Sequence, residues 1–235
     1  DSASLALATL LAMAITGASA VVVDWLVFRR IRAKADALSM VIASFGVALI
    51  IRNAITLIFG HNAQLFSQDI AFATVLSTDP LILVKADQVF VLVAALALMA
   101  AFHIVLTRTA FGFALRAVAE NPTLAQVAGV RLSTMIVAVW LIGGGLSAAA
   151  GVFYTLTNHL SPALGHNFLL PVFGATIVGG IGSVYGAVLG GFLVGVASGL
   201  SLAILPSGYV PAMPFLIILA VLLLRPHGLF GEDHA

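Results

Sequence analysis

The stretch Val89-Phe-Val-Leu-Val-Ala-Ala-Leu-Ala-Leu-Met-Ala-Ala-Phe-His-Ile-Val-Leu-Thr107 decides the fold class of this chain. It contains no Asp, Glu, Lys or Arg. It matches the roughly 20 apolar residues that a helix needs to cross the hydrocarbon core of a bilayer. Four other segments have the same character: residues 5–28, 38–59, 135–156 and 185–205. Two shorter apolar segments, 168–180 and 209–224, complete a predicted all-α, polytopic transmembrane bundle of about seven spans.

The composition of the chain agrees with a membrane setting. Hydrophobic residues make up 62% of the 235 residues and charged residues only 8%, whereas an ordinary soluble domain is about 25% charged. A water-soluble globule has too little polar surface to cover so much apolar chain, so we expect membrane lipid around it. The net charge of +1 gives no reason to expect nucleic acid as a partner. The absence of cysteine excludes disulfides, thiolate metal sites and cysteine nucleophiles.

The basic residues of the connections predict how the helices are oriented. When the spans are counted alternately, one side of the membrane receives Arg29, Arg30, Arg32, Lys34, Arg108, Arg116, Arg131 and Arg225. The opposite side receives Lys85. The positive-inside rule makes the basic side cytoplasmic, so we expect the start of the chain outside and its C-terminus inside.

The start of the chain predicts a retained membrane helix. The first residue is Asp1, and arginines follow the first apolar stretch, which reverses the charge order of a cleavable signal peptide. We therefore interpret residues 1–235 as a single transmembrane domain.

Two features of the first half allow more than one interpretation. Arg52 lies inside a span beside Asn53, where it either snorkels to the headgroups or faces a translocation path, and snorkelling is the simpler interpretation. Residues 61–87 form the longest connection on the predicted outer side. They predict either a short interfacial helix or a surface for an extracytoplasmic partner.

Glycine is concentrated in the last third of the chain. Nine of the 22 glycines lie between Gly174 and Gly199. Two series are spaced by four residues: Gly182, Gly186 and Gly190, and then Gly191, Gly195 and Gly199. This spacing puts small residues on one face of a helix, where a neighbouring backbone can approach closely. We therefore expect this helix to be pressed against another. Gly143-Gly144-Gly145 predicts a flexible or close-packed point in the preceding span.

The run Gly179-Gly-Ile-Gly-Ser183 predicts a break between two apolar segments, since each glycine weakens a helix by about 1 kcal/mol. Two interpretations remain open: a tight cytoplasmic turn, and a broken or re-entrant helix that lines a pore.

The third basic connection predicts two short helices. Residues 113–120 have helix-forming composition, and Pro122 disfavours helix at the residue before it. Asn121 is a good N-cap and Pro122 a good first residue for the second helix. Leu124, Val127 and Ala128 share one face of that helix, and Gly129 is suited to ending it. An apolar face of this kind either docks in a partner groove or lies on the membrane surface.

Three motifs in order then resemble a known family. The loop Arg108-Thr-Ala-Phe-Gly-Phe-Ala-Leu-Arg-Ala-Val-Ala-Glu-Asn-Pro-Thr-Leu-Ala-Gln-Val-Ala-Gly-Val130 resembles the coupling loop of bacterial branched-chain amino acid ABC permeases. The run Gly179-Gly-Ile-Gly-Ser-Val-Tyr-Gly-Ala-Val-Leu-Gly-Gly191 resembles the glycine signature of that family, and Leu224-Arg-Pro-His-Gly-Leu-Phe-Gly231 resembles its C-terminal motif. The resemblance covers essentially the whole chain.

Two departures from the family accompany the resemblance. Family members begin with further spans that carry an Asn-Phe-Ala-His-Gly-like motif, so we expect this chain to be truncated at its start. At Asp24-Trp25 and at Arg30 the family more often has glutamate and proline.

The resemblance implies a place in a transport machine of the bacterial inner membrane. It implies a second permease subunit, two cytoplasmic ABC ATPase subunits and a periplasmic solute-binding protein that delivers leucine, isoleucine or valine. ATP and Mg²⁺ would be held by the ATPase subunits, with no cofactor, metal or catalytic residue on this chain. The implied ATPase-coupling residues are Arg108, Gly112, Arg116, Glu120, Asn121, Pro122, Leu124, Ala125, Val127 and Gly129. The implied pore or packing segment comprises Gly179, Gly180, Gly182, Ser183, Gly186, Gly190 and Gly191.

Other functions agree less well with the residues themselves. No Gly-Lys-Ser/Thr phosphate loop occurs, so the energy must come from another subunit or an ion gradient. An ion-coupled transporter is disfavoured because no acid lies mid-span and His103 lies near the inner end of its span. A serine protease is disfavoured because His159 and His166 fall on the side opposite Ser183. A permease for a sugar, urea or an amide stays open.

Overall fold

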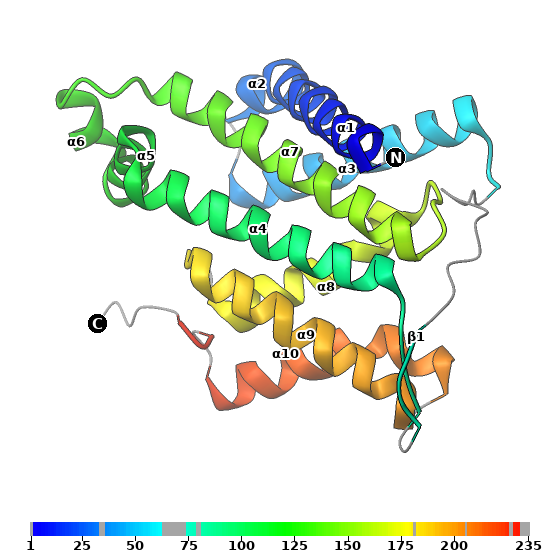
Figure 1. Ribbon diagram of the computed structural model, residues 1–235. Coiled ribbons are helices and arrows are strands. Elements are labelled where there is room, and N and C mark those ends of the chain that lie inside the picture. The colour runs from blue at the N-terminus through cyan, green and yellow to red at the C-terminus, as the bar shows by residue number, and fades with distance from the viewer. Residues whose placement is uncertain are drawn as a thin grey trace. The chain divides into compact units, whose positions relative to one another are not determined.

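A computed structural model describes residues 2–32, 36–62, 74–78, 81–180, 182–204, 206–225 and 228–230 of the chain (Figure 1). The helices of the first part are α1 (Ser2–Val23), the π-helical turn η1 (Asp24–Phe28), α2 (Arg29–Ile31) and α3 (Ala37–Phe59). A hairpin of β1 (Thr74–Thr78) and β2 (Leu81–Val84) precedes α4 (Ala86–Arg108), α5 (Ala110–Glu120), α6 (Pro122–Val127) and α7 (Leu132–Thr157). The last part holds α8 (Leu164–Gly179), α9 (Val184–Ile204), the 3₁₀ turn η2 (Ser207–Ala212) and α10 (Met213–Leu224).

Five helical segments are long and apolar enough to cross a membrane, which confirms the five long segments predicted. They are Ser4–Ile31, Leu38–Phe59, Asp87–Arg108, Leu132–Thr157 and Val184–Leu202. The two predicted shorter segments are α8 and α10, with 16 and 12 residues. At about 1.5 Å per residue they rise about 24 and 18 Å, less than the roughly 30 Å of a hydrocarbon core. Helix length therefore supports five crossings, and the count of seven stays a prediction.

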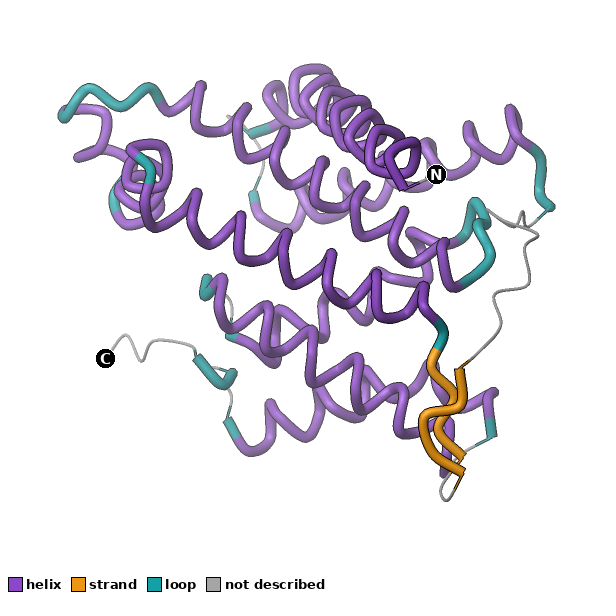
Figure 2. Tube along the Cα trace, viewed as in Figure 1, coloured by secondary structure: helices purple, strands orange, loops and turns teal. Residues whose placement is uncertain are grey.

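The connection between α3 and α4 departs from the all-α expectation (Figure 2). β1 and β2 pair antiparallel, with Thr74 opposite Val84 and Thr78 opposite Leu81. An interfacial helix is therefore wrong for residues 74–78 and 81–84, while residues 63–73 lie outside the described part. β-Branched residues are frequent in both strands and favour extended backbone over helix. Asp79-Pro80 between the strands is a turn signal in the sequence.

The chain divides into two compact units, Asp1–Ser161 and Pro162–Ala235. In the first unit, α1 packs along α7 (Figure 1). A Cβ at Gly17 would lie 2.7 Å from the carbonyl oxygen of Leu141, and one at Gly144 would lie 2.9 Å from the Cβ of Ala20. The glycine triplet of α7 is thus a close-packed point at Gly144, whereas Gly143 has open space beside it. Small residues are what let these two helices approach.

In the second unit, α8 packs against both α9 and α10. Gly174 of α8 faces Ile218 and Pro214 of α10, where a Cβ would meet the Ile218 side chain at 3.4 Å. The prediction of one membrane domain over residues 1–235 stays a prediction.

Candidate functional site

The site begins at the corner between α4 and α5. The Thr109 hydroxyl accepts a hydrogen bond from the backbone N–H of Gly112 (3.1 Å), which caps the start of α5. Gly112 is buried, and a Cβ there would overlap the carbonyl oxygen of Leu106 in α4. Glycine is therefore required for this tight corner, which fixes the direction in which α5 leaves the long helix α4.

The elbow between α5 and α6 has the predicted form. Asn121 adopts an extended conformation, and its side-chain oxygen accepts hydrogen bonds from the backbone N–H groups of Thr123 (3.1 Å) and Leu124 (3.0 Å). Pro122 occupies the first helical position, where its missing N–H costs nothing. Both predictions for the start of the second helix are confirmed.

The end of α6 is closed by a Schellman motif. Gly129 has φ +90°, and its N–H donates to the carbonyl of Gln126 (3.0 Å). The N–H of Val130 donates to the carbonyl of Ala125 (2.9 Å). This pair of hydrogen bonds satisfies carbonyl groups that a helix end would otherwise leave free, and it needs a left-handed residue at Gly129. The predicted role of Gly129 is confirmed.

The second helix presents an apolar face, which we call the α6 face and define by Leu124 and Val127. Their side chains are 70% and 87% exposed, respectively. Ala125 is only 4% exposed and faces inward. On α5, Phe113 is also exposed, and the Arg116 guanidinium lies over its ring at 4.8 Å from the centroid. Two adjacent apolar side chains held outward on a doubly capped helix form a surface suited to a partner groove.

The ten predicted coupling residues divide into exposed and buried ones. Among them the structure exposes Arg108, Arg116, Glu120, Asn121, Pro122, Leu124, Val127 and Gly129, and it buries Gly112 and Ala125.

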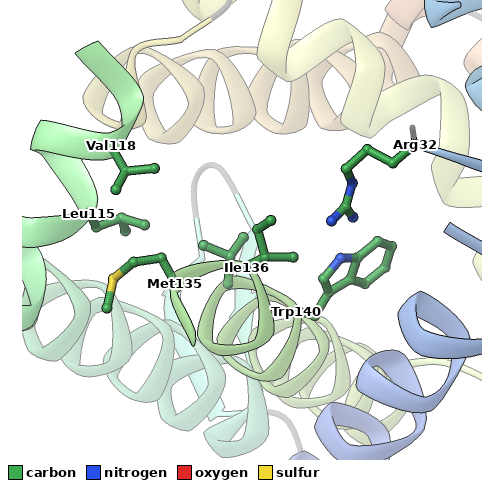
Figure 3. Close-up of a pocket in the computed structure, with 7 residues that line it drawn as sticks. Arg32, Leu115, Val118, Met135, Ile136 and Trp140 are labelled. Atoms are coloured by element: carbon green, nitrogen blue, oxygen red, sulfur yellow. The ribbon is translucent and has the colours of Figure 1, made fainter. Parts of the chain in front are cut away.

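A groove of about 240 Å³ lies beside this region, and sequence reasoning missed it (Figure 3). It is lined by Arg32, by Leu115 and Val118 of α5, and by Met135, Ile136, Val139 and Trp140 of α7. The guanidinium of Arg32 forms an ion pair with the buried carboxylate of Asp24 (2.5 Å). The ring of Phe28 stacks on Trp140 with the centroids 5.2 Å apart. The sequence contains one signal for this ion pair. Arg32 follows Asp24 by eight residues, a spacing that places both side chains near one face of a helix.

The glycine segment forms a tight helical hairpin. α8 ends at Gly179 and α9 begins at Val184, while Gly180 and Gly182 have φ of +103° and +99°. The hydroxyl of Ser183 accepts a hydrogen bond from the N–H of Gly186 (3.0 Å) and so caps α9. The structure has a turn at this run, which both interpretations allow; Ile181 lies outside the described residues. A place in a pore stays a prediction.

Two glycines of the first series, Gly186 and Gly190, lie where α8 and α9 touch. A Cβ at Gly186 would overlap the carbonyl oxygen of Gly179, and one at Gly190 would overlap that of Ala175. Close packing is therefore confirmed for Gly186 and Gly190, whereas Gly182 precedes α9 and nothing described lies within 4 Å of a Cβ there. The second series behaves differently, because Gly191 has an ordinary contact with Ala175 and nothing described lies within 4 Å of a Cβ at Gly195 or Gly199.

The structure also places Arg52 and the Ser183–histidine pair considered from the sequence. Arg52 is half-buried in α3, and the side-chain amide of the neighbouring Asn53 donates to the Leu49 carbonyl. His166 lies in the first turn of α8 and Ser183 lies beyond its last residue, so about 20 Å of helix separates them. This separation disfavours a pairing of Ser183 with His166 for nucleophilic catalysis.

Comparison with known proteins identifies relatives of this chain. LivH of Methanocaldococcus jannaschii, a probable branched-chain amino acid transport permease protein, is 33% identical over 143 residues, which cover 58% of this chain and 45% of the relative. BraD of Pseudomonas aeruginosa, a high-affinity branched-chain amino acid transport system permease protein, is 30% identical over 187 residues, which cover 74% of this chain and 61% of the relative. The fructose import permease protein FrcC of Rhizobium meliloti is 33% identical over 101 residues, which cover 40% of this chain and 28% of the relative.

The chain thus spans about half the length of the first of these relatives. No solved structure matches it significantly. The family described as branched-chain amino acid transport system, permease component, matches residues 2–224, which is nearly the whole chain. The chain therefore belongs to the branched-chain amino acid ABC transporter permease family, whose members are non-catalytic transport subunits.

Proposed function

We propose that this chain is the membrane part of an importer that moves branched-chain amino acids into the cytoplasm. Separate ATPase subunits drive the importer, a second permease subunit completes the pathway, and a periplasmic binding protein delivers the solute. The observation that carries the proposal is the α6 face, with Leu124 and Val127 exposed on a helix that is capped at both ends.

A six-residue helix needs such caps to serve as a docking element. Isolated helices of this length are unstable in water, because nucleation costs more than a few hydrogen bonds return. The Asn121 cap and the Schellman motif at Gly129 satisfy the groups that would otherwise favour unfolding. A preformed apolar face then loses little conformational entropy when it enters a groove on the ATPase.

The contacts around α6 provide a route for movement. α6 packs on α5 and α7, and α5 joins α4 through the corner at Gly112. A displacement of α6 by the ATPase would therefore be carried into α4 and α7, both long enough to cross the membrane. ATP can switch the pathway between its inward-open and outward-open states only if the two states bind the ATPase differently. In this proposal, α6 is the element whose position differs between them.

Orientation supports the same assignment. The α6 face lies between Arg116 and Arg131 in the chain, among the basic residues that the positive-inside rule puts in the cytoplasm. An ATPase that uses cytoplasmic ATP must dock on that side.

The proposal is tested by placing a charge on the α6 face and measuring transport by the full-length importer reconstituted in vesicles. Leu124→Asp places a carboxylate where a desolvated apolar contact is expected. We expect it to lower both leucine uptake and solute-stimulated ATP hydrolysis by about ten-fold or more, the usual effect of losing an interface hot spot. Gln126→Glu adds the same charge at an exposed position of the same helix that points away from the face, and it should leave both activities near the unmodified level. Unchanged uptake with Leu124→Asp would refute the proposal.

A sugar is the second candidate solute, because the fructose import permease shares part of this sequence. The same vesicles discriminate the two. With the cognate binding protein present, labelled leucine should accumulate, and excess isoleucine or valine should compete, whereas fructose, urea and small amides should not. Accumulation of fructose but not of leucine would show that the solute is a sugar. The proposed coupling role of α6 would be unaffected by that result.

A further inference from the structure

Each carbonyl group in the last turn of α8 accepts a hydrogen bond. The last four carbonyls of a helix have no partner within it. Here the N–H of Gly180 donates to Thr176 (3.0 Å) and to Ile177 (3.2 Å). The two carbonyls that remain are those of Val178 and Gly179. Their donors come from the far end of the chain: Leu229 N–H to Val178 (2.9 Å) and Phe230 N–H to Gly179 (3.0 Å).

These hydrogen bonds are made in a buried place. Val178 is 1% exposed, and Gly179, Gly180 and Gly228 are buried too. Water has little access there, so a lost donor would leave a carbonyl without any partner. The side chains of Leu229 and Phe230 are 36% and 49% exposed. The hydrogen bonds between this segment and α8 are made by its backbone.

Gly228 fits the contact both in conformation and in space. Its φ is +79°, which side-chain-bearing residues rarely adopt. A Cβ there would lie 2.6 Å from the Cα of Gly180 and 2.7 Å from the carbonyl oxygen of Ile177. On its other side, Gly179 is pressed against Gly186 of α9. Three segments therefore meet at the turn: the end of α8, the start of α9 and residues 228–230.

We propose that residues 228–230, here called the C-terminal strap, bind the end of α8 as an intramolecular backbone ligand and hold that end where it packs against Gly186 of α9. The glycine motif and the C-terminal motif are then two halves of one site. This inference concerns the second unit of the chain and stands independently of the solute and of α6. The alternative role for such a segment, a tail that binds another protein, requires its backbone donors to be free.

The direct test is hydrogen exchange in the assembled, unmodified complex. The amides of Leu229 and Phe230 should exchange about ten-fold or more slowly than the same peptide in a free chain, since they donate to buried carbonyls. Exchange at the free-chain rate would overturn the proposal, and this result depends on no variant folding.

A second test removes one of the two donors. Leu229→Pro deletes the N–H that Val178 accepts, whereas Leu229→Ala keeps it and removes only a side chain. Because the chain contains no cysteine, a single Val178→Cys reports exposure of this buried position. The thiol should react with maleimide on the order of ten-fold faster with Leu229→Pro and at the parent rate with Leu229→Ala. Equal rates in the two variants would contradict the strap.

The matched glycine pair tests the close contact. Gly228→Ala should also accelerate labelling of Val178→Cys, since its methyl group collides with Gly180. Gly199→Ala adds the same methyl group in α9, where nothing described lies within 4 Å, and should not. An unaltered rate with Gly228→Ala would show that this position tolerates a side chain and that the strap does not sit as described.

Discussion

At the scale of single residues, one buried ion pair governs the end of the first span. Asp24 is 4% exposed and lies in the π-helical turn η1, where its carboxylate meets the guanidinium of Arg32. An acid taken out of water requires a partner, because desolvation penalises its charged form. The same arginine lines the groove between α5 and α7. The pair thus ties the end of the first span to the elements that support α6.

Breaking this pair from one side should destabilise the chain. Arg32→Gln leaves the Asp24 carboxylate buried without its partner. A fully buried pair costs about 3–5 kcal/mol to break, and because the arginine is partly exposed we expect about 1–3 kcal/mol here. The thermal midpoint of the detergent-solubilised complex should fall accordingly.

Two further variants separate the ion pair from charge alone. Arg30→Gln removes an exposed arginine two residues earlier and should leave the midpoint unchanged. The double variant Asp24→Asn with Arg32→Gln removes both charges and should recover part of the loss. A midpoint that is equally low in the Arg30 variant would show that net charge, and not the pair, is what matters.

At the scale of elements, glycine spacing decides which helices touch. Gly190 faces the carbonyl of Ala175 across the α8–α9 contact, whereas Gly195, further along the same helix, faces open space. In lipid, apolar side chains gain nothing from leaving the solvent, so helices associate where small residues allow backbone approach. Gly186 and Gly190 of the first series meet that condition, whereas Gly195 and Gly199 of the second leave a face of α9 uncovered by the described residues.

The two series supply a matched pair of substitutions. Gly190→Leu should separate α8 from α9 and lower the yield of intact complex in size-exclusion chromatography, because overpacking costs about 1–3 kcal/mol. Gly195→Leu inserts the same side chain where there is room and should give the unmodified yield. Equal yields from both variants would mean that the close approach at Gly190 contributes nothing to assembly.

Features that depend on neighbouring residues alone can be predicted from the sequence. The five long spans follow from apolar length, and the α5–α6 elbow follows from Asn121, Pro122 and Gly129, whose preferences act on adjacent backbone. The sequence favours the β1–β2 hairpin only weakly: β-branched residues and Asp79-Pro80 are signals for it, but β2 is a short apolar run, and such runs do not distinguish strand from helix. The corner at Gly112 has no sequence signal, since its cause is a clash with Leu106 across the turn.

Long-range contacts are the part that the sequence does not reveal. In the strap, Leu229 is hydrogen-bonded to Val178. Neither the glycine motif nor the C-terminal motif contains a sequence feature that identifies the other as its partner. The ion pair of Asp24 and Arg32 is within reach by spacing, but the groove beside it depends on the packing of α5 and α7. Substrate contacts cannot be predicted, because an apolar solute is recognised by the same residue types that fill helix interfaces.

At the scale of the whole molecule, exposed apolar surface is the dominant feature. Large apolar side chains lie exposed along the long helices, for example Leu57, Ile58 and Leu92. Such a surface is stable only against lipid or other membrane helices, and the family supplies a setting with both. The α6 face is different in kind, since it lies on a short connection rich in arginine. That is why we assign it to a water-soluble partner.

Labelling of Val127 tests this central claim most directly. A Val127→Cys variant carries the only thiol of the chain, on a side chain that is 87% exposed. In vesicles that hold the full importer, a membrane-impermeant maleimide should reach it only from the cytoplasmic side, and only after the ATPase subunits are stripped away. Lys85→Cys, predicted on the outer side, should react from outside whether or not the ATPase is present. Reaction of Val127→Cys from outside, or at one rate with and without the ATPase, would contradict the assignment.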